Sequence, residues 1–269
     1  MKRIIILSLM TLMMAIVPQW IQARNYALCV GLDAYPAKVG RYRVKPLRVS
    51  GNDARVMKKM FAANGFSTSL LTDSAATCEA VLRAMKYRFC TAREDDVVIF
   101  YFSGHGTEEG LLCYDNVLST ASIVEEFKRC KARTKMLIAD ACYSGRMRND
   151  TVWQNTFSKK EDVILFLSSR TSEVSLETMY SNSLFTMYLE RGLRGGADVN
   201  KDKRITAREL YDFVHESVTD DHFVNGSQHP VMWGGFDGNN TIVNWERKAK
   251  KNKNKDKKQN IIDDDTSND

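Results

Sequence analysis

Several patterns that would assign the chain to a common class of protein are missing. Its six cysteines form no C-x-x-C pair, so neither a zinc site nor a thioredoxin-like redox site is indicated. The apolar run near the N-terminus is shorter than the ~20 residues needed to span a bilayer. No cysteine follows that run where a lipid anchor would require one, and no internal repeat is visible. The overall composition is that of a globular protein. With 43% apolar and 27% charged residues, the chain suits one α/β domain with a full core.

The N-terminus has the composition of a targeting segment. Lys2 and Arg3 precede an apolar run from Ile4 to Val17, and Ala23 offers a small residue at a cleavage point. This pattern predicts a signal peptide over residues 1–23 and an exported protein, periplasmic or secreted, with no stable membrane span after cleavage. An uncleaved membrane anchor is the alternative.

The C-terminus is charged and of low complexity. Residues 246–269 carry a run of basic side chains and then Asp263, Asp264 and Asp265, which predicts a disordered tail. No aromatic residues alternate with the basic ones to stack on bases, so we expect no nucleic-acid partner. The globular domain is therefore expected over residues 24–245.

Between these ends, apolar runs alternate with segments of helical periodicity. Strands are expected at residues 25–31, 66–71, 97–103, 136–139 and 163–167, and helices at 50–64, 75–89, 119–130, 183–193 and 206–218. A short hairpin is expected at 110–118. This alternation predicts an α/β fold with a mainly parallel central sheet flanked by helices. At the first helix, Ser50 and Asp53 have the spacing of a capping box.

Two of the expected strands end in chemically active residues. One is followed by Gly104, His105 and Gly106, and the other leads through Asp140 into Cys142. Open α/β sheets bind ligands beyond the carboxyl ends of their strands. Neighbouring strands would place an imidazole beside a thiol, as nucleophilic catalysis by a thiolate requires. The backbone N–H groups of Gly106 and Cys142 could then face a developing oxyanion.

The other cysteines give no clear pairing. If Cys142 stays free, five remain, so at least one more is unpaired, and the connectivity cannot be read from the sequence. For Cys29 and Cys113 we favour buried free thiols that act as small apolar residues.

The two strand ends resemble the His and Cys boxes of the caspase-like cysteine peptidases. Y-F-S-G-H-G at Tyr101–Gly106 and D-A-C-Y-S-G at Asp140–Gly145 are most similar to the metacaspase-like, bacterial branch. Further collinear segments lie at Gly31–Pro36, Pro46–Arg55 and Ser183–Leu189. The resemblance implies a caspase-like three-layer sandwich and a dyad in which Cys142 is the nucleophile and His105 the general acid/base. One departure is Tyr143, where the familiar box has His after the nucleophile.

The resemblance also bears on specificity. Aspartate-cutting caspases have Gln two residues before the nucleophile, whereas this chain has Asp140. A buried carboxylate there would reject an acidic side chain and pair with Arg or Lys. By resemblance, Asp53 and Ser103 also line the S1 pocket. The alternatives are helix capping for Asp53 and a structural hydrogen bond that holds the active-site loop for Asp140.

We therefore expect a monomeric cysteine endopeptidase that cuts polypeptides after Arg or Lys. A catalytically silent caspase-like interaction module, and a clostripain- or legumain-like peptidase with another P1 choice, are the alternatives. Self-cleavage is a hypothesis for the basic loop over residues 146–162, at Arg146, Arg148, Lys159 or Lys160.

No cofactor is required by this chemistry, and the site residues include no metal ligand. Some metacaspases are calcium-activated through an acidic cluster; Asp115 and Asp150 are candidates here but fit no convincing frame. The segment Asp198–Glu209 also has EF-hand spacing, with oxygen ligands from Asp198, Asn200, Asp202 and Glu209. Lys203 replaces the turn glycine, so a helix-capping turn is the favoured interpretation.

Overall fold

The computed structural model describes residues 25–141, 153, 163–169, 181–222, 225–234 and 238–245. Their centre is a six-stranded sheet in the order β11-β9-β8-β5-β1-β4. Its strands are β1 (Tyr26–Gly31), β4 (Ser67–Thr72), β5 (Val97–Ser103), β8 (Thr134–Asp140), β9 (Val163–Leu167) and β11 (Val231–Gly234). Adjacent strands from β4 to β9 run parallel, whereas β11 pairs with β9 in the antiparallel direction.

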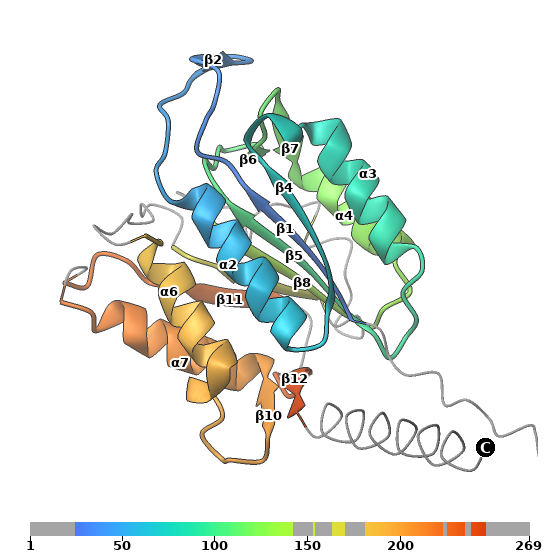
Figure 1. Cartoon of the computed structure of the whole chain (residues 1–269), viewed down its shortest axis with the longest axis vertical. Coiled ribbons are helices and arrows are strands. Elements are labelled where there is room, and N and C mark those ends of the chain that lie inside the picture. The colour runs from blue at the N-terminus through green and yellow to red at the C-terminus, as the bar shows by residue number, and fades with distance from the viewer. Residues whose placement is uncertain are drawn as a thin grey trace, which may run out of the picture.

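Helices cover both faces of this sheet (Figure 1). On one face lie α3 (Cys78–Phe89) and α4 (Thr120–Arg129), and on the other α2 (Ser50–Ala63), α6 (Leu184–Arg191) and α7 (Ala207–Thr219). The result is a three-layer α/β sandwich, as predicted. Short pairs complete the described fold: β2 (Lys38–Val39) with β3 (Tyr42–Arg43), β6 (Gly110–Leu112) with β7 (Val117–Ser119), and β10 (Arg204–Thr206) with β12 (Thr241–Asn244).

The central strands are apolar on both sides because both sides are covered. Along β5, Phe100 and Phe102 face α3 and α4, while Ile99 and Tyr101 face the helices of the opposite layer. Every residue of β5 is buried. A strand buried on both faces is read in the sequence as a continuous apolar run rather than an alternating one, which is why these strands were predictable.

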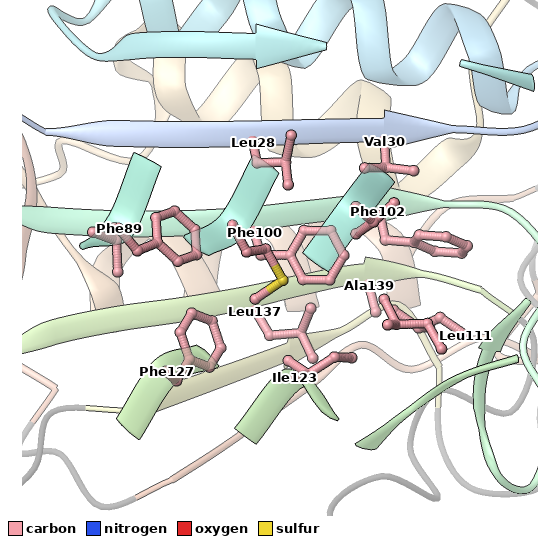
Figure 2. Packing of buried hydrophobic residues seen from close by; sticks show 14 of the residues in the cluster. Leu28, Val30, Phe89, Phe100, Phe102, Leu111, Ile123, Phe127, Leu137 and Ala139 are labelled. Atoms are coloured by element: carbon pink, nitrogen blue, oxygen red, sulfur yellow. The ribbon is translucent and has the colours of Figure 1, made fainter. Parts of the chain in front are cut away.

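Aromatic side chains fill the layer between the sheet and the α3–α4 pair. Phe89 of α3 and Phe127 of α4 stack with ring centroids 5.9 Å apart. Figure 2 shows them with Phe100, Phe102 and other members of the same cluster. Leu111 of β6 belongs to this cluster too, so the β6–β7 hairpin is anchored in the core.

Most expected elements are confirmed within one or two residues, and some details differ. Residues 75–89 divide into a 3-10 turn, η1 (Asp73–Ala75), and α3, because Thr77 caps α3 by accepting the N–H of Ala80. After α6 the chain continues as a π-helical turn, η3 (Gly192–Gly196). The antiparallel edge strand β11 was not predicted. It is a short run, V-M-W-G, in a glycine-rich region, and its four residues are only partly buried.

The capping box predicted at the first helix is wrong. Val49 is the N-cap of α2, and no side chain of the helix caps it. Instead the carboxylate of Asp33 accepts the N–H groups of Ser50 and Gly51, at 2.7 and 3.0 Å. Asp33 lies just after β1, so the cap comes from a distant part of the sequence and frees Asp53 for other contacts.

Several predictions fall outside the described residues: the signal peptide, the charged tail and the possible self-cleavage sites Arg146, Arg148, Lys159 and Lys160. Trp153 is described, and it is buried against Phe127 at a ring-centroid distance of 6.1 Å. Among the described helices, none combines the length and the hydropathy that crossing a bilayer requires.

Candidate active site at the strand ends

The ends of β5 and β8 lie side by side, as the sequence predicted. Ser103 and Asp140, the last residues of the two strands, are register partners. The N–H of Gly104 donates to the carbonyl of Asp140 at 3.1 Å, which extends the pairing by one residue. His105 and Cys142 thus each follow a paired residue by two positions in the sequence.

Main-chain contacts fix His105 on both sides. Its N–H donates to the hydroxyl of Tyr35 at 3.1 Å, and its carbonyl accepts the N–H of Leu112 at 2.9 Å. The Tyr35 hydroxyl in turn donates to the carbonyl of Leu112 at 3.0 Å, which closes a ring of hydrogen bonds. Gly104 makes room for this tyrosine, because a Cβ at that position would lie 2.6 Å from the hydroxyl.

The imidazole of His105 is oriented by a backbone carbonyl. Its Nε2 lies 2.7 Å from the carbonyl oxygen of Lys45. A carbonyl can only accept, so Nε2 carries the proton, and in the neutral ring Nδ1 is the basic nitrogen. The ring also leans against Tyr35, with centroids 5.1 Å apart. His105 is therefore held with Nδ1 ready to take up a proton.

Gly106 bridges to Leu111 of β6 without using its own amide. The two hydrogen bonds of the bridge run from Leu112 N–H to His105 and from Thr107 N–H to Gly110, at 2.9 and 2.8 Å. They flank the Gly106–Leu111 pair, so this is a non-hydrogen-bonded pair in which the N–H of Gly106 points away from β6. That orientation fits the predicted role of an oxyanion donor.

The peptide that precedes Cys142 is held by two serines beyond β9. The N–H of Ala141 donates to the hydroxyl of Ser168 at 3.2 Å, and the hydroxyl of Ser169 donates to the carbonyl of Ala141 at 3.5 Å. Gln228 secures this turn, because its amide donates to the carbonyl of Ser168 at 2.9 Å. Cys142 itself lies outside the described residues.

The three residues assigned to S1 come from different elements and gather behind the strand ends. Asp53 of α2 is 0% exposed, Ser103 of β5 is 1% exposed and Asp140 of β8 is 4% exposed. The hydroxyl of Ser103 donates to Asp53 at 3.0 Å. The charges of Asp53 and Asp140 act on each other, so the structure brings two carboxylates into one buried place.

The start of α6 supplies the donors for both carboxylates. Ser183, the N-cap of α6, donates its N–H to Asp53 at 3.0 Å and its hydroxyl to Asp140. The side-chain amide of Asn182 donates a hydrogen bond to Asp53 at 2.9 Å, and the hydroxyl of Thr186 donates one to Asp140 at 2.8 Å. The positive end of a helix dipole favours negative charge at this point.

Burial is the main influence on the protonation of Asp53. Burial and, after it, the negative charge of Asp140 raise the pKa of Asp53 to about 7, although the hydrogen bonds from Asn182, Ser183 and Ser103 lower it. A neighbouring cation would favour the fully ionised form of both carboxylates.

A family model described as the caspase domain (Peptidase C14) matches residues 24–237, most of the chain. The chain belongs to the caspase domain family. This membership supports cysteine-peptidase activity of the general type and implies polypeptide substrates.

Among solved structures, the domain is similar to the crystal structure of protein GSU0716 from Geobacter sulfurreducens. The TM-score is 0.62 and the identity 18%, and the alignment covers 79% of this chain and 94% of that one. At this identity the likeness concerns the fold. No curated protein matches the sequence.

In this caspase domain the segment Asp198–Glu209 folds as a capping turn. The carboxylates of Asp198 and Asp202 accept backbone N–H groups within the loop, as does the side chain of Asn200. Glu209 forms a capping box with Thr206 at the start of α7. In the described ranges, no group of three or more His, Cys, Asp or Glu side chains is placed to hold a metal ion. Asp115 accepts the N–H of Cys78 at 2.8 Å, and Asp150 is not described.

Sequence reasoning missed several supporting residues. The carbonyl of Lys45 carries no side-chain signal, although a residue before proline is biased toward extended backbone, as here before Pro46. Ser183 and Thr186 were placed in a helix but not in the site. A Ser at an expected helix start was the available hint, since such a residue caps the helix and has a hydroxyl to share.

Proposed function

We propose that this caspase domain is a cysteine endopeptidase that cleaves after Arg or Lys, with Cys142 as nucleophile and His105 as general acid/base. The observation that carries the P1 choice is the buried pair Asp53 and Asp140 beside the catalytic histidine. A catalytic role for His105 is supported by its geometry: Lys45 accepts from Nε2, which leaves Nδ1 as the base.

The chemistry follows from these positions. Nδ1 of His105 would accept the thiol proton of Cys142 and later give it to the leaving amine. The thiolate attacks the scissile carbonyl, and water hydrolyses the resulting thioester. The N–H groups of Gly106 and Cys142 would donate to the tetrahedral oxyanion.

The carboxylate pair supports a cationic P1 side chain on grounds of charge. Two buried carboxylates that act on each other are unfavourable unless a positive group joins them, and a guanidinium offers several donors at once. Asn182, which donates to Asp53, also lines a hollow of about 530 Å³ with Tyr188, Arg191 and Asp221 among its walls. An open volume thus lies one side chain away from the carboxylates. An acidic P1 residue would meet two like charges.

The test is hydrolysis of matched peptides with Arg, Lys, Asp or Asn at P1, with and without calcium, by wild type and Cys142→Ala. We expect cleavage after Arg and Lys only, none by Cys142→Ala, and no dependence on calcium. Cleavage only after Asp would contradict the role of the carboxylates. Cleavage after Asn would favour a legumain-like peptidase, and no cleavage at all would favour a silent interaction module.

Export to the periplasm or the medium and self-cleavage are further parts of the proposal. Both rest on the sequence, namely the N-terminal 23 residues and the basic loop at 146–162. Purified wild type is expected to release fragments that end at Arg146, Arg148, Lys159 or Lys160. Identical fragments from Cys142→Ala would assign the cutting to another peptidase.

A further inference from the structure

Two thiols lie together on the opposite side of the sheet from the carboxylate pair. Cys78 is the first residue of α3, and Cys113 directly follows β6. Their side chains lie close enough for each thiol to shift the pKa of the other. All five cysteines that the structure describes are free, and these are the two for which another thiol is the main influence on the pKa.

The backbone around the two thiols is already tied together. Asn116 accepts at one carbonyl from both cysteines, from the Cys78 thiol at 3.3 Å and from the Cys113 N–H at 2.9 Å. Cys78 N–H also donates to Asp115 at 2.8 Å, and Tyr114 N–H donates to Ala76 at 3.0 Å. The segment 113–116 is thus fixed against the start of α3, with the Cys78 thiol and the Cys113 N–H on the same carbonyl oxygen.

The two thiols differ in a way that suits stepwise oxidation. Cys78 is half-buried, whereas Cys113 is fully buried. The neighbouring Cys113 lowers the pKa of the Cys78 thiol, although burial and the nearby Asp115 work against this. Cys78, together with burial, raises the pKa of Cys113. Cys78 is the accessible thiol with the greater thiolate character, which makes it the attacking group.

We propose that Cys78 and Cys113 form a disulfide by exchange with a small-molecule disulfide of the oxidised-glutathione class. The Cys78 thiolate attacks one sulfur of that molecule, and a mixed disulfide forms as one small thiolate leaves and takes up a proton. Cys113 then gives up its proton and attacks the Cys78 sulfur, which releases the second small thiol. Two protein thiols are oxidised to one disulfide, and the external disulfide is reduced to two thiols.

This modification would act on the support of His105. Cys113 follows Leu112, whose N–H and carbonyl bind His105 and Tyr35 at 2.9 and 3.0 Å. A disulfide would tie that hairpin covalently to α3. Oxidation is favoured in the exported state proposed above, where disulfides persist.

Peptide mapping tests the pairing without any need for peptidase activity. The full chain carrying Cys142→Ala is equilibrated in a glutathione buffer at roughly −200 mV, then acid-quenched, unfolded, alkylated and digested with trypsin. Cleavage after Lys59, Arg83, Arg93 and Lys128 leaves the two cysteines in separate peptides, 60–83 and 94–128. We expect most of the protein to yield these two peptides joined by a disulfide.

Two further variants in the same background make the test specific. Cys78→Ser should abolish the cross-link, whereas Cys90→Ser, which alters an exposed thiol, should leave it intact. Reduction should lower the midpoint of thermal unfolding by roughly 5–10 °C in the Cys142→Ala and Cys90→Ser proteins and hardly at all in Cys78→Ser. Full alkylation of Cys78 and Cys113 after oxidation, or a cross-link of Cys113 to another cysteine, would overturn the proposal. Either result leaves the proposed peptidase function untouched, because Cys142 is absent throughout.

Discussion

His105 and the Asp53–Asp140 pair lie at the same end of the sheet, but different kinds of contact hold them. His105 is half-buried and bound through the carbonyl of Lys45, the N–H of Leu112 and the hydroxyl of Tyr35. The carboxylates are buried, and side chains of β5, of α6 and of the two residues before α6 supply most of their hydrogen bonds.

Because backbone groups hold His105 and side chains hold the carboxylates, the two regions suit different tasks. Backbone groups orient an imidazole with little dependence on neighbouring side chains, so the histidine can keep its geometry as surface residues vary. A buried carboxylate pair depends on the hydroxyl and amide groups around it, and these set its charge. The first region suits proton transfer, and the second suits recognition of a charge.

The largest expected effect is at the histidine. His105→Asn should lower kcat/KM on Arg peptides by roughly 10²–10⁴-fold, because the proton shuttle is lost. The fold should persist, since the contacts of residue 105 to Tyr35 and Leu112 use its backbone. Steady-state kinetics and circular dichroism measure both. Glu79→Gln, at a side chain of α3 that is 85% exposed, is the control and should keep full activity. Activity of His105→Asn within tenfold of wild type would contradict the assignment.

The next effect concerns the carboxylates and pH. Folding raises the pKa of Asp53 to about 7 from an ordinary value of 3.8, so the folded protein holds a proton that the unfolded chain releases. This contribution to stability is full below about pH 4 and is lost as the pH rises to about 7. Relative to Asp53→Asn, the wild type should therefore lose on the order of 2 kcal/mol of unfolding free energy between pH 4 and pH 7.5.

Urea unfolding at several pH values measures that difference. Asp220→Asn, at an exposed carboxylate, should follow the wild type across the whole range. If the free-energy difference between wild type and Asp53→Asn stays constant with pH, Asp53 does not titrate in this window, and its pKa is not raised to about 7.

The smallest expected effect is at the ring of hydrogen bonds around the histidine. Tyr35→Phe removes the hydroxyl that joins His105 to Leu112, which should cost about 1–2 kcal/mol of unfolding free energy and lower kcat several-fold. Tyr42→Phe removes two exposed hydrogen bonds, one to Glu109 and one from Arg41, and should change stability by less than about 0.5 kcal/mol. Equal effects of the two variants would show that the Tyr35 hydroxyl does not support the site.

The two regions also differ in how far the sequence predicted them. Both strand ends were predictable, because β5 and β8 are continuous apolar runs that stop at Gly104 and at Asp140. The gathering of Asp53, Ser103 and Asp140 was reached by resemblance, and the structure brings them together. The hydrogen bonds that they accept from Ser183 and Thr186 could not be predicted from the sequence, because these bonds depend on where α6 packs.

Contacts made by backbone groups, or by capping residues far away in the chain, leave no recognisable pattern in the sequence. The carbonyl of Lys45 is chemically like any other, so only its place beside His105 gives it a role. Asp33 caps α2 across a long loop, which local spacing around Ser50 could not indicate. The contact between Cys78 and Cys113 likewise arises from tertiary packing.

Buried carboxylates at the strand ends are proposed to select a positive P1 side chain. The ratio of kcat/KM for two peptides that differ only in P1 arginine or its neutral isostere citrulline, in wild type and Asp140→Asn, tests this selection. We expect a ratio of at least about 100 in wild type, as when a buried charged partner is lost, and a ratio reduced at least tenfold in Asp140→Asn. Equal hydrolysis of both peptides by wild type, or an unchanged ratio in Asp140→Asn, would contradict the proposed selection.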